Sequence, residues 1–312
     1  MTKVKSKITP DTILKNFWKD NNRFADLFNA CFFDGNPELN PDDLTEVDTD
    51  ISSLLQFHGY AETVKKIVDV VKKSAYGVDF VILGIENQAK IHYAMPLRHM
   101  LGDAFSYLKE YNEIAKKYKD EKPHGTPDEF LSKMKKTDRL HSVLTICIYY
   151  GETPWDGPRS LIDMLEIPDA FKPLISDYKF NLIELRKSEH LKFHNNDVDK
   201  IFNISRFIFD EKYDKITDIF KDENISSELA MVIGCITESQ KLINDAVESE
   251  EKGGSVNMCK ALEKLEERGR QEGRLEGRLQ GQIVTKLKLI LKKVHKNKSF
   301  DQIVDELEED SD

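Results

Sequence analysis

Cysteine is scarce in this sequence, and the few cysteines are far apart in the chain. The 312 residues include four cysteines, Cys31, Cys147, Cys235 and Cys259, and no two of them form a CxxC pair. Structural zinc sites need closely spaced Cys and His ligands, and disulfide-dependent domains need denser cysteines. We therefore predict reduced thiols and exclude both of those protein classes.

Long apolar runs are also missing. No stretch reaches the ~18 to 20 apolar residues of a membrane span. The first ten residues, MTKVKSKITP, are basic but lack the apolar segment of a secretory signal. We expect a soluble, cytoplasmic protein without a membrane partner.

The chain carries an excess of acid, with a formal net charge of −10. Nonspecific coating of nucleic acid needs an excess of Lys and Arg to neutralise phosphates, so the charge argues against that class. Lys and Arg are nevertheless dense at 65–73, 116–122 and 264–296. An enzyme that binds DNA through one local basic surface is compatible with this distribution.

Apolar periodicity predicts a chain of mixed helices and strands. Apolar residues recur at helical spacing over 12–33 and from Met95 to about Tyr118, whereas β-branched runs indicate strands. The predicted strands are 63–73, 78–90, 140–151 and 178–187, and further helices are predicted at about Asp197–Phe209 and Ile225–Glu248. The sequence thus indicates an α/β fold with a central sheet flanked by helices.

The two strands 63–73 and 78–90 are predicted to form a hairpin. A two-residue loop at Gly77-Val78 would place glycine where such loops prefer it. The pairs then have residue numbers that sum to 155, which sets Asp69 opposite Glu86. Directly opposed residues have Cβ atoms about 4.5–5.5 Å apart, so these two carboxylates could share one metal ion.

The stretch GIENQAK (84–90) carries the chemistry of this hairpin. On a strand, Glu86, Gln88 and Lys90 would project from one face. Carboxylate oxygens suit Mg²⁺, which polarises a scissile phosphate and activates water. From the residues alone the signal is weak, and ordinary solvated hairpin charges are the favoured explanation.

Several segments resemble the recombination-promoting nuclease / putative transposase family, a branch of the PD-(D/E)XK nuclease superfamily. ILGIENQAKIHYAMPLRHM (82–100) resembles the family's signature, a strand ending in Glu-x-Gln or Glu-x-Lys before a helix that begins MPLR. FADLFNA (24–30), VKKIVDVVKK (64–73) and ICIYYGETPWDGPRSLIDML (146–165) are similar to its N-terminal helix, preceding strand and later loop, and the Gly-Arg repeats are similar to its C-terminal tail. The resemblance covers about residues 11 to 285.

The resemblance implies a restriction-endonuclease-like fold and hydrolysis of DNA with Mg²⁺, or with Mn²⁺ in its place. Asp69 and Glu86 take the positions of the metal ligands. Gln88 stands where the superfamily's general pattern has lysine, and an amide carries no charge. Lys90 is the candidate to supply that charge. We also expect four basic residues to contact the DNA backbone: Lys65, Lys66, Lys72 and Arg98.

Other acidic and aromatic residues are candidates for the same site. Either Asp11 or Asp20 could add a third acid to the site, although helix capping explains Asp11 as well. Asp79 shares a strand with Glu86, too far along it to replace Asp69. We assign Trp155 to a turn anchor rather than to base stacking.

The predicted organisation has four parts. A nuclease-like core spans 10–190, a helical extension 191–250, a Gly/Arg-rich helical arm 258–297 and an acidic tail 298–312. Glycines at 269, 273, 277 and 281 could let two arms pack closely, so we expect a homo-oligomer formed through the arm. A flexible charged arm is the alternative.

Two functions from other classes compete with the nuclease. The chain could retain the fold as a DNA-binding or oligomerising protein that has lost catalysis, with the arm as its working part. It could also be a protein-binding scaffold, which would have no salt-dependent affinity for DNA.

Overall fold

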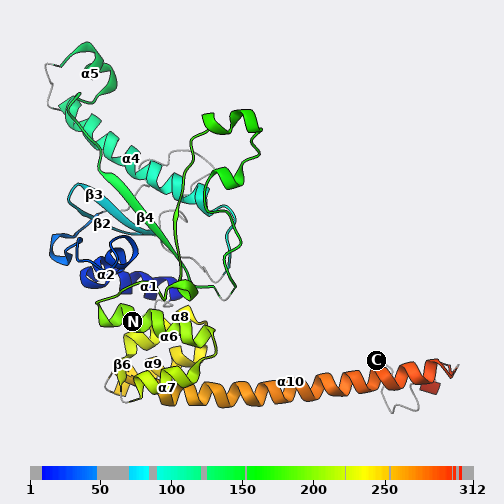
Figure 1. Cartoon of the computed structure of the whole chain (residues 1–312). Helices are drawn as coiled ribbons and strands as arrows, with labels where there is room; N and C mark the ends of the chain where they lie inside the picture. Colours follow the sequence, from blue (N-terminus) through cyan, green and yellow to red (C-terminus); the bar gives the residue numbers. More distant parts are fainter. Residues whose placement is uncertain are drawn as a thin grey trace, which may run out of the picture.

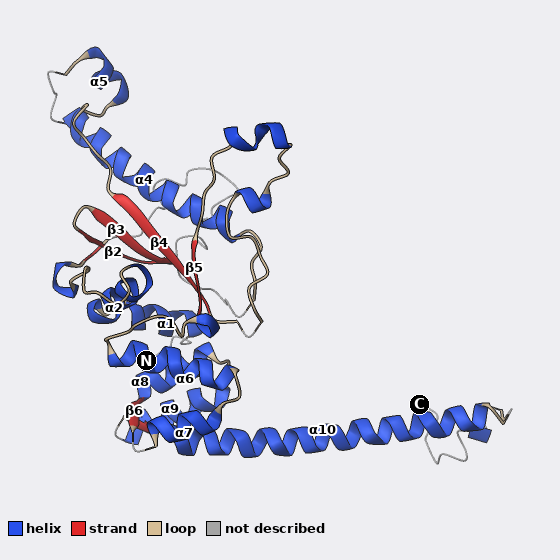
Figure 2. Ribbon diagram, in the orientation of Figure 1, coloured by secondary structure: helices blue, strands red, loops and turns tan. Residues whose placement is uncertain are grey.

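The computed structural model describes residues 9–47, 70–83, 90–120, 125–151, 153–221, 223–252, 254–296, 298–299 and 302–303. A five-stranded mixed sheet lies between helices, so the predicted α/β class is confirmed at that level (Figures 1 and 2). In spatial order its strands are β1 (Thr45–Glu46), β2 (Val70–Ala75), β3 (Val78–Leu83), β4 (Ser142–Tyr149) and β5 (Asn181–Glu184).

Helices surround this sheet and continue beyond it. The α-helices are α1 (Pro10–Trp18), α2 (Asn21–Phe32), α4 (Met95–Asp120), α5 (Pro127–Ser132), α6 (Asn196–Phe209), α7 (Tyr213–Phe220), α8 (Ser227–Ile236), α9 (Gln240–Lys252) and α10 (Met258–Val294). Short 3-10 helices are η1 (Pro41–Asp43), η3 (Ile162–Met164), η4 (Asp169–Leu174) and η5 (Leu185–Lys187). A separate ribbon pairs β6 (Asn224–Ser226) with β7 (Ser255–Asn257).

The sheet changes from antiparallel to parallel at β3. Strands β1, β2 and β3 pair antiparallel, whereas β3, β4 and β5 pair parallel. A parallel pair needs a crossover connection, which α4 supplies between β3 and β4. Figure 2 shows α4 on one side of the sheet and α1 with α2 on the other.

The hairpin turn differs from the predicted one. Ala75 pairs with Val78, so the loop residues are Tyr76 and Gly77, with φ of 55° and 74°. Positive φ at both positions is the conformation of a type I′ turn, whose twist suits a hairpin. Paired residue numbers therefore sum to 153, and the predicted register with a sum of 155 is wrong.

The turn is tied to η1 by its tyrosine. The Tyr76 hydroxyl donates a hydrogen bond to Asp43 and accepts one from the Asn40 backbone N–H at 3.4 Å. These contacts hold a non-glycine residue in the left-handed region, which is otherwise unfavourable for it.

The predicted helix 12–33 is two helices. Thr9 caps α1, accepting from the Thr12 N–H at 3.3 Å, and Asp20 caps α2, accepting from the Arg23 N–H at 3.0 Å. Asp11 lies in the first turn of α1, where a carboxylate suits the helix dipole. The chain breaks at Lys19 because Asp20 is extended, with ψ of 128°.

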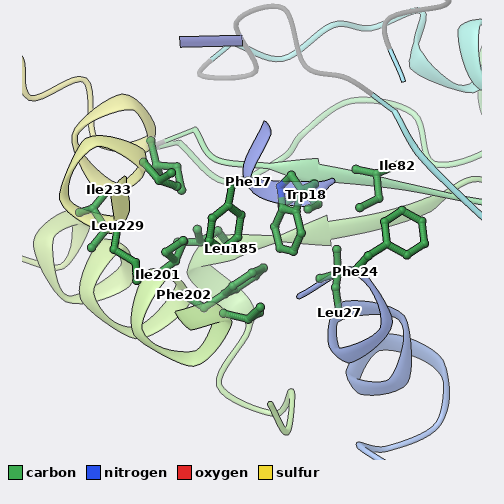
Figure 3. Close-up of a cluster of buried hydrophobic side chains, with 14 of the residues drawn as sticks. Phe17, Trp18, Phe24, Leu27, Ile82, Leu185, Ile201, Phe202, Leu229 and Ile233 are labelled. Carbon is green, nitrogen blue, oxygen red and sulfur yellow. The ribbon is translucent and has the colours of Figure 1, made fainter. Parts of the chain in front are cut away.

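The main core lies between the sheet and the N-terminal helices and continues into the later helices. It includes Phe17 and Phe24 from α1 and α2, Ile82 from β3, and Phe202 from α6, all at most 2% exposed (Figure 3). Alternation along β4 divides its side chains between two faces. Ile146 and Ile148 join this core, whereas Cys147 and Tyr149 pack on the α4 side, where Cys147 is fully buried.

The predicted helix Ile225–Glu248 is interrupted. Residues 224–226 form β6, and α8 ends at Ile236, where Glu238 adopts a φ of 52° before α9 begins. Gly234 allows this close turn, because a Cβ there would lie 3.0 Å or less from Ile243. Helix α6 agrees with the prediction to within one residue.

Helix α10 begins beside α7, α9 and β7 and extends away from the rest of the molecule (Figure 1). Its 37 residues span about 55 Å at 1.5 Å per residue. Within the described ranges, none of the helices combines the length and the low charge that crossing a bilayer requires.

One lysine is buried in the main core. Lys73 of β2 has no exposed surface, and its ammonium donates to the Lys19 carbonyl and to Asn21 Oδ1. It also lies 5.3 Å from the centre of the Phe24 ring. Burial lowers the pKa of Lys73 below 10.5, and Glu46 and Asp20 offset part of that shift.

The burial of Lys73 predicts a pH dependence of stability. Because its folded-state pKa lies below the unfolded value of 10.5, the unfolded chain binds more protons between the two values. Relative to Lys73→Met, wild-type protein should therefore gain free energy of unfolding as pH rises through this window, by at most ~1.4 kcal/mol per pH unit. Chemical denaturation from neutral pH to about pH 10 measures the difference. The exposed Lys19→Met variant is the control, and parallel curves for wild type and Lys73→Met would contradict the prediction.

Candidate functional site

The candidate site is the edge of the sheet where β3, β4 and β5 end. The three strands are parallel, so Leu83, Tyr149 and Glu184 end them at the same edge. Open α/β sheets bind ligands beyond the carboxyl ends of parallel strands. Strand β3 leads directly into the stretch GIENQAK.

Three of the four predicted catalytic residues, Asp69, Glu86 and Gln88, lie outside the described residues. The prediction that Asp69 lies opposite Glu86 assumed paired residue numbers that sum to 155. Between Val70 and Leu83 the observed pairs sum to 153 instead. A two-residue shift changes which residues are directly opposed but not the face on which each one lies.

Lys90 is exposed and lies in a bend shortly before α4. The prediction that it continues the strand is therefore wrong, because it has left the sheet. After it, Ile91 packs on Gly157, where an added Cβ would lie 3.1 Å from the Ile91 side chain. Lys90 thus stands beside the loop that follows β4.

That loop is anchored by Trp155. The indole is 6% exposed, stacks edge-on against Tyr149 and Phe180, and donates from Nε1 to the Gly157 carbonyl at 2.8 Å. An indole with its ring buried and its N–H bonded cannot stack on a base. This agrees with its assignment as a turn anchor.

Glu184 organises the charges at this edge. Its side chain is 8% exposed and accepts hydrogen bonds from Arg159, from Lys187 at 2.9 Å and from the Trp155 N–H at 3.2 Å. Burial opposes ionisation and is the largest single influence on its pKa. The three donors together outweigh it, so the pKa of Glu184 lies below its ordinary value.

The described carboxylates do not by themselves form a metal site. In the parts of the chain that the structure describes, no group of three His, Cys, Asp or Glu side chains is placed to hold an ion. Glu184 has its oxygens engaged by cations and a backbone N–H, so it is a poor ligand for Mg²⁺. The metal ligands implied by the family resemblance are Asp69 and Glu86.

The predicted contacts to DNA have different environments. Lys65 and Lys66 lie outside the described residues. Lys72 forms an ion pair with Asp79 at 2.7 Å, and its side chain is 9% exposed. A DNA phosphate would therefore have to displace Asp79 to reach it. Arg98 is partly exposed on the first turns of α4.

Sequence reasoning missed a buried polar cluster between α4 and β4. Asp103 accepts hydrogen bonds from the Thr145 hydroxyl at 2.6 Å and from the Tyr178 hydroxyl. His99, one turn earlier, is 2% exposed and lies 4.0 Å from Asp103. The available signal was the spacing of His99, Asp103 and Tyr107 at four-residue intervals, which places three polar residues along one side of α4.

The cluster is a structural element rather than an open site. Burial lowers the pKa of His99, and Asp103 offsets this only in part, so the imidazole is neutral at pH 7. Burial, followed by the bond to Asp103, raises the pKa of Tyr178 and keeps its hydroxyl protonated. The Thr145 and Tyr178 hydroxyls donate to Asp103, and His99 Nε2 lies 3.3 Å from the Thr145 carbonyl, so the cluster holds α4 on the sheet.

No protein-family model matches the chain, and neither do any of the curated proteins or solved structures compared with it. The resemblance to the nuclease family therefore rests on the sequence motifs quoted above.

Glu184 predicts a second pH dependence. Its folded-state pKa is depressed below 4.5, so its stabilisation is present above that value and is lost as pH falls through the folded pKa. Glu184→Gln should lower the free energy of unfolding at pH 7 by about 1–2 kcal/mol because its charge-assisted hydrogen bonds are weakened. Urea denaturation at neutral and acidic pH measures this, and the exposed Glu166→Gln is the control. Equal stability of Glu184→Gln and wild type at pH 7 would rule the effect out.

Proposed function

We propose that the chain is a metal-dependent DNA endonuclease with a restriction-endonuclease-like core. The observation that carries the proposal is the position of the hairpin's open end. Val70 and Leu83 are directly paired, and β3 ends at the same edge as β4 and β5. The chain therefore enters β2 and leaves β3 at one place on this edge. In the sequence, Asp69 directly precedes Val70 and Glu86 follows Leu83 by three residues, and such edges are where open α/β sheets bind ligands.

The order of elements supports the same proposal. Helices α1 and α2 precede the hairpin, and α4 follows it as a crossover to the parallel strand β4. A helix, an acidic hairpin and a second helix form the arrangement on which many nucleases build a magnesium site. The motif MPLR lies at the start of α4, as the family resemblance implies.

In this proposal Asp69 and Glu86 hold Mg²⁺, for which Mn²⁺ can substitute. The ion, when bound, polarises the scissile phosphate and lowers the pKa of the attacking water. Gln88 orients that water or a backbone phosphate through its amide. Lys90 supplies positive charge near the phosphate from the bend before α4, where its side chain is exposed.

The charges at this edge favour an anionic substrate. Arg159 and Lys187 both bind Glu184, so two cations face one carboxylate, and each cation remains about half exposed. With a formal net charge of −10, the whole chain repels DNA at long range. In this proposal the contacts to DNA phosphates come from individual cations at this edge, Arg159 and Lys187, together with Arg98 on α4.

The competing function is a DNA-binding or oligomerising protein that has lost hydrolysis. Gln88 favours this alternative, because an amide cannot replace the positive charge of the usual lysine. The alternative predicts DNA binding without Mg²⁺-dependent cleavage.

Loss of a metal ligand should abolish cleavage while preserving the fold. Asp69→Asn or Glu86→Gln should reduce nicking of supercoiled plasmid by Mg²⁺ at least ~100-fold, since metal stabilisation contributes several kcal/mol. DNA affinity, measured by fluorescence anisotropy over a salt series, should change little. Asp169→Asn, whose side chain is 94% exposed, is the matched control. Nicking that is insensitive to EDTA and equal in all variants would refute the nuclease, and binding without any nicking would support the alternative.

Lys90 can be tested separately. Lys90→Ala should lower the single-turnover rate of plasmid cleavage by about 10-fold or more, because one cation near the developing charge is lost. Lys90→Arg should restore part of that rate, since it keeps the charge. The exposed Lys133→Ala is the control for a lysine far from the sheet edge in the sequence. An unchanged rate for Lys90→Ala would exclude the assigned role.

A further inference from the structure

The outer half of α10 carries an exposed apolar face. Ile283, Leu287 and Val294 expose 57%, 54% and 51% of their surfaces, and Val284 and Leu291 expose 48% and 57%. Soluble monomers rarely leave such a contiguous apolar surface in water. Helices in proteins are stabilised mainly by packing an apolar face, so this half of α10 lacks its usual source of stability.

The apolar residues are spaced for helix packing. Ile283, Leu287, Ile290 and Val294 follow one another at intervals of four, three and four residues, which is the heptad spacing of a coiled coil. We call these four residues the seam. In heptad terms Leu287 and Val294 occupy position a, and Ile283 and Ile290 occupy position d.

The glycine repeat does not form this seam. On a helix, a step of four residues rotates the position by about 40°, so the glycines at 269 to 281 wind around α10 instead of lining one face. A Cβ added at Gly277 or Gly281 would meet no atom within 4 Å. Packing of two arms along the glycine line stays a prediction, and the seam is a separate apolar surface on the same helix.

Nothing in the described part of the chain covers the seam as a whole. Helix α10 meets α7, α9 and β7 near its start, and its outer half lies away from them (Figure 1). A partner helix with the same heptad spacing would cover the seam. Helix α10 of a second copy of this chain is such a helix.

We propose that this chain self-associates through the seam as a parallel bundle of more than two α10 helices. The two flanks of the seam determine the orientation. Position e on one flank holds Val284 and Leu291, and position g on the other holds Lys286 and Lys293. In a parallel bundle, e of one helix lies beside g of the next, so each lysine stem covers an apolar side chain. In an antiparallel pair, g would face g and the lysines would oppose one another.

The residues of the seam determine the number of copies. Leu287 at position a lies between Ile283 and Ile290 at position d, and leucine at a with isoleucine at d favours trimers or tetramers over dimers. Apolar residues at e widen the face that must be buried, which a two-helix contact would leave partly exposed. Both features indicate a bundle larger than a dimer.

Mass in solution tests the proposal on the full chain. Sedimentation equilibrium should give three or four times the mass of 36.0 kDa, and Ile283→Glu and Leu287→Glu should each reduce it to that of the monomer. Leu289→Glu is the matched control, because Leu289 is exposed on α10 but lies at position c, off the seam. Circular dichroism checks that each variant remains folded. A monomeric or dimeric wild type, or equal loss of association in Leu289→Glu, would overturn the proposal.

Orientation and partner class need two further measurements. Val294→Cys should form an interchain disulfide under mild oxidation, because a parallel arrangement brings position 294 of neighbouring copies together. An antiparallel arrangement would keep them apart, so a yield no higher than for wild type would overturn the parallel bundle. A basic amphipathic helix can also bind an anionic membrane surface. Co-sedimentation with phosphatidylglycerol vesicles tests this alternative partner. A chain that stays monomeric and binds these vesicles through Ile283 and Leu287 would assign the seam to a membrane surface and refute self-association.

Discussion

The parallel pairing of β3 with β4 is the constraint on which the rest of the structure depends. An antiparallel hairpin can return through two residues, whereas a parallel neighbour requires a crossover. Helix α4 must therefore span one face of the sheet. This packing buries the side of α4 that carries His99 and Asp103. The same pairing brings the carboxyl ends of β3, β4 and β5 to one edge, where Glu184 gathers Arg159 and Lys187.

Both faces of the sheet contain a buried ionisable group, and each has its own set of partners. Lys73 faces α1 and α2 and is held by a helix-end carbonyl and an amide oxygen. Asp103 faces the sheet from α4 and is held by two hydroxyl groups. A buried polar group without partners costs more than a hydrogen bond contributes. These contacts therefore specify how the helices sit on the sheet more than they add to its stability.

The sheet edge and the seam of α10 lie in different parts of the molecule and need different tests. In the proposal, hydrolysis depends on two carboxylates close to β2 and β3 in the sequence, whereas self-association depends on apolar side chains of α10 far from the sheet (Figure 1). A parallel bundle would hold several sheet edges on the same side of the assembly. If each edge binds DNA, the bundle would raise the effective concentration of the others along the same duplex.

The sequence by itself determined the elements whose periodicity is long and regular. Helix α4, strand β4 and helix α6 were predicted nearly at their observed bounds, because burial of one face imposes a period that is visible in the residues. The sequence also indicated the mixed α/β class and Trp155 as a turn anchor. The assignment of Asp69 and Glu86 as catalytic acids comes from the motif resemblance and stays a prediction.

Only the tertiary structure decided the hairpin register, the break between α1 and α2, and the polar cluster under α4. Local rules favoured glycine as the first loop residue, whereas the loop begins at Tyr76, which is held at positive φ by Asp43 of a distant segment. Asp103 became a buried acceptor because Tyr178, far away in the sequence, reaches it across β4. Turn type and polar burial depend on contacts between segments remote in sequence, and no local pattern of residues contains that information.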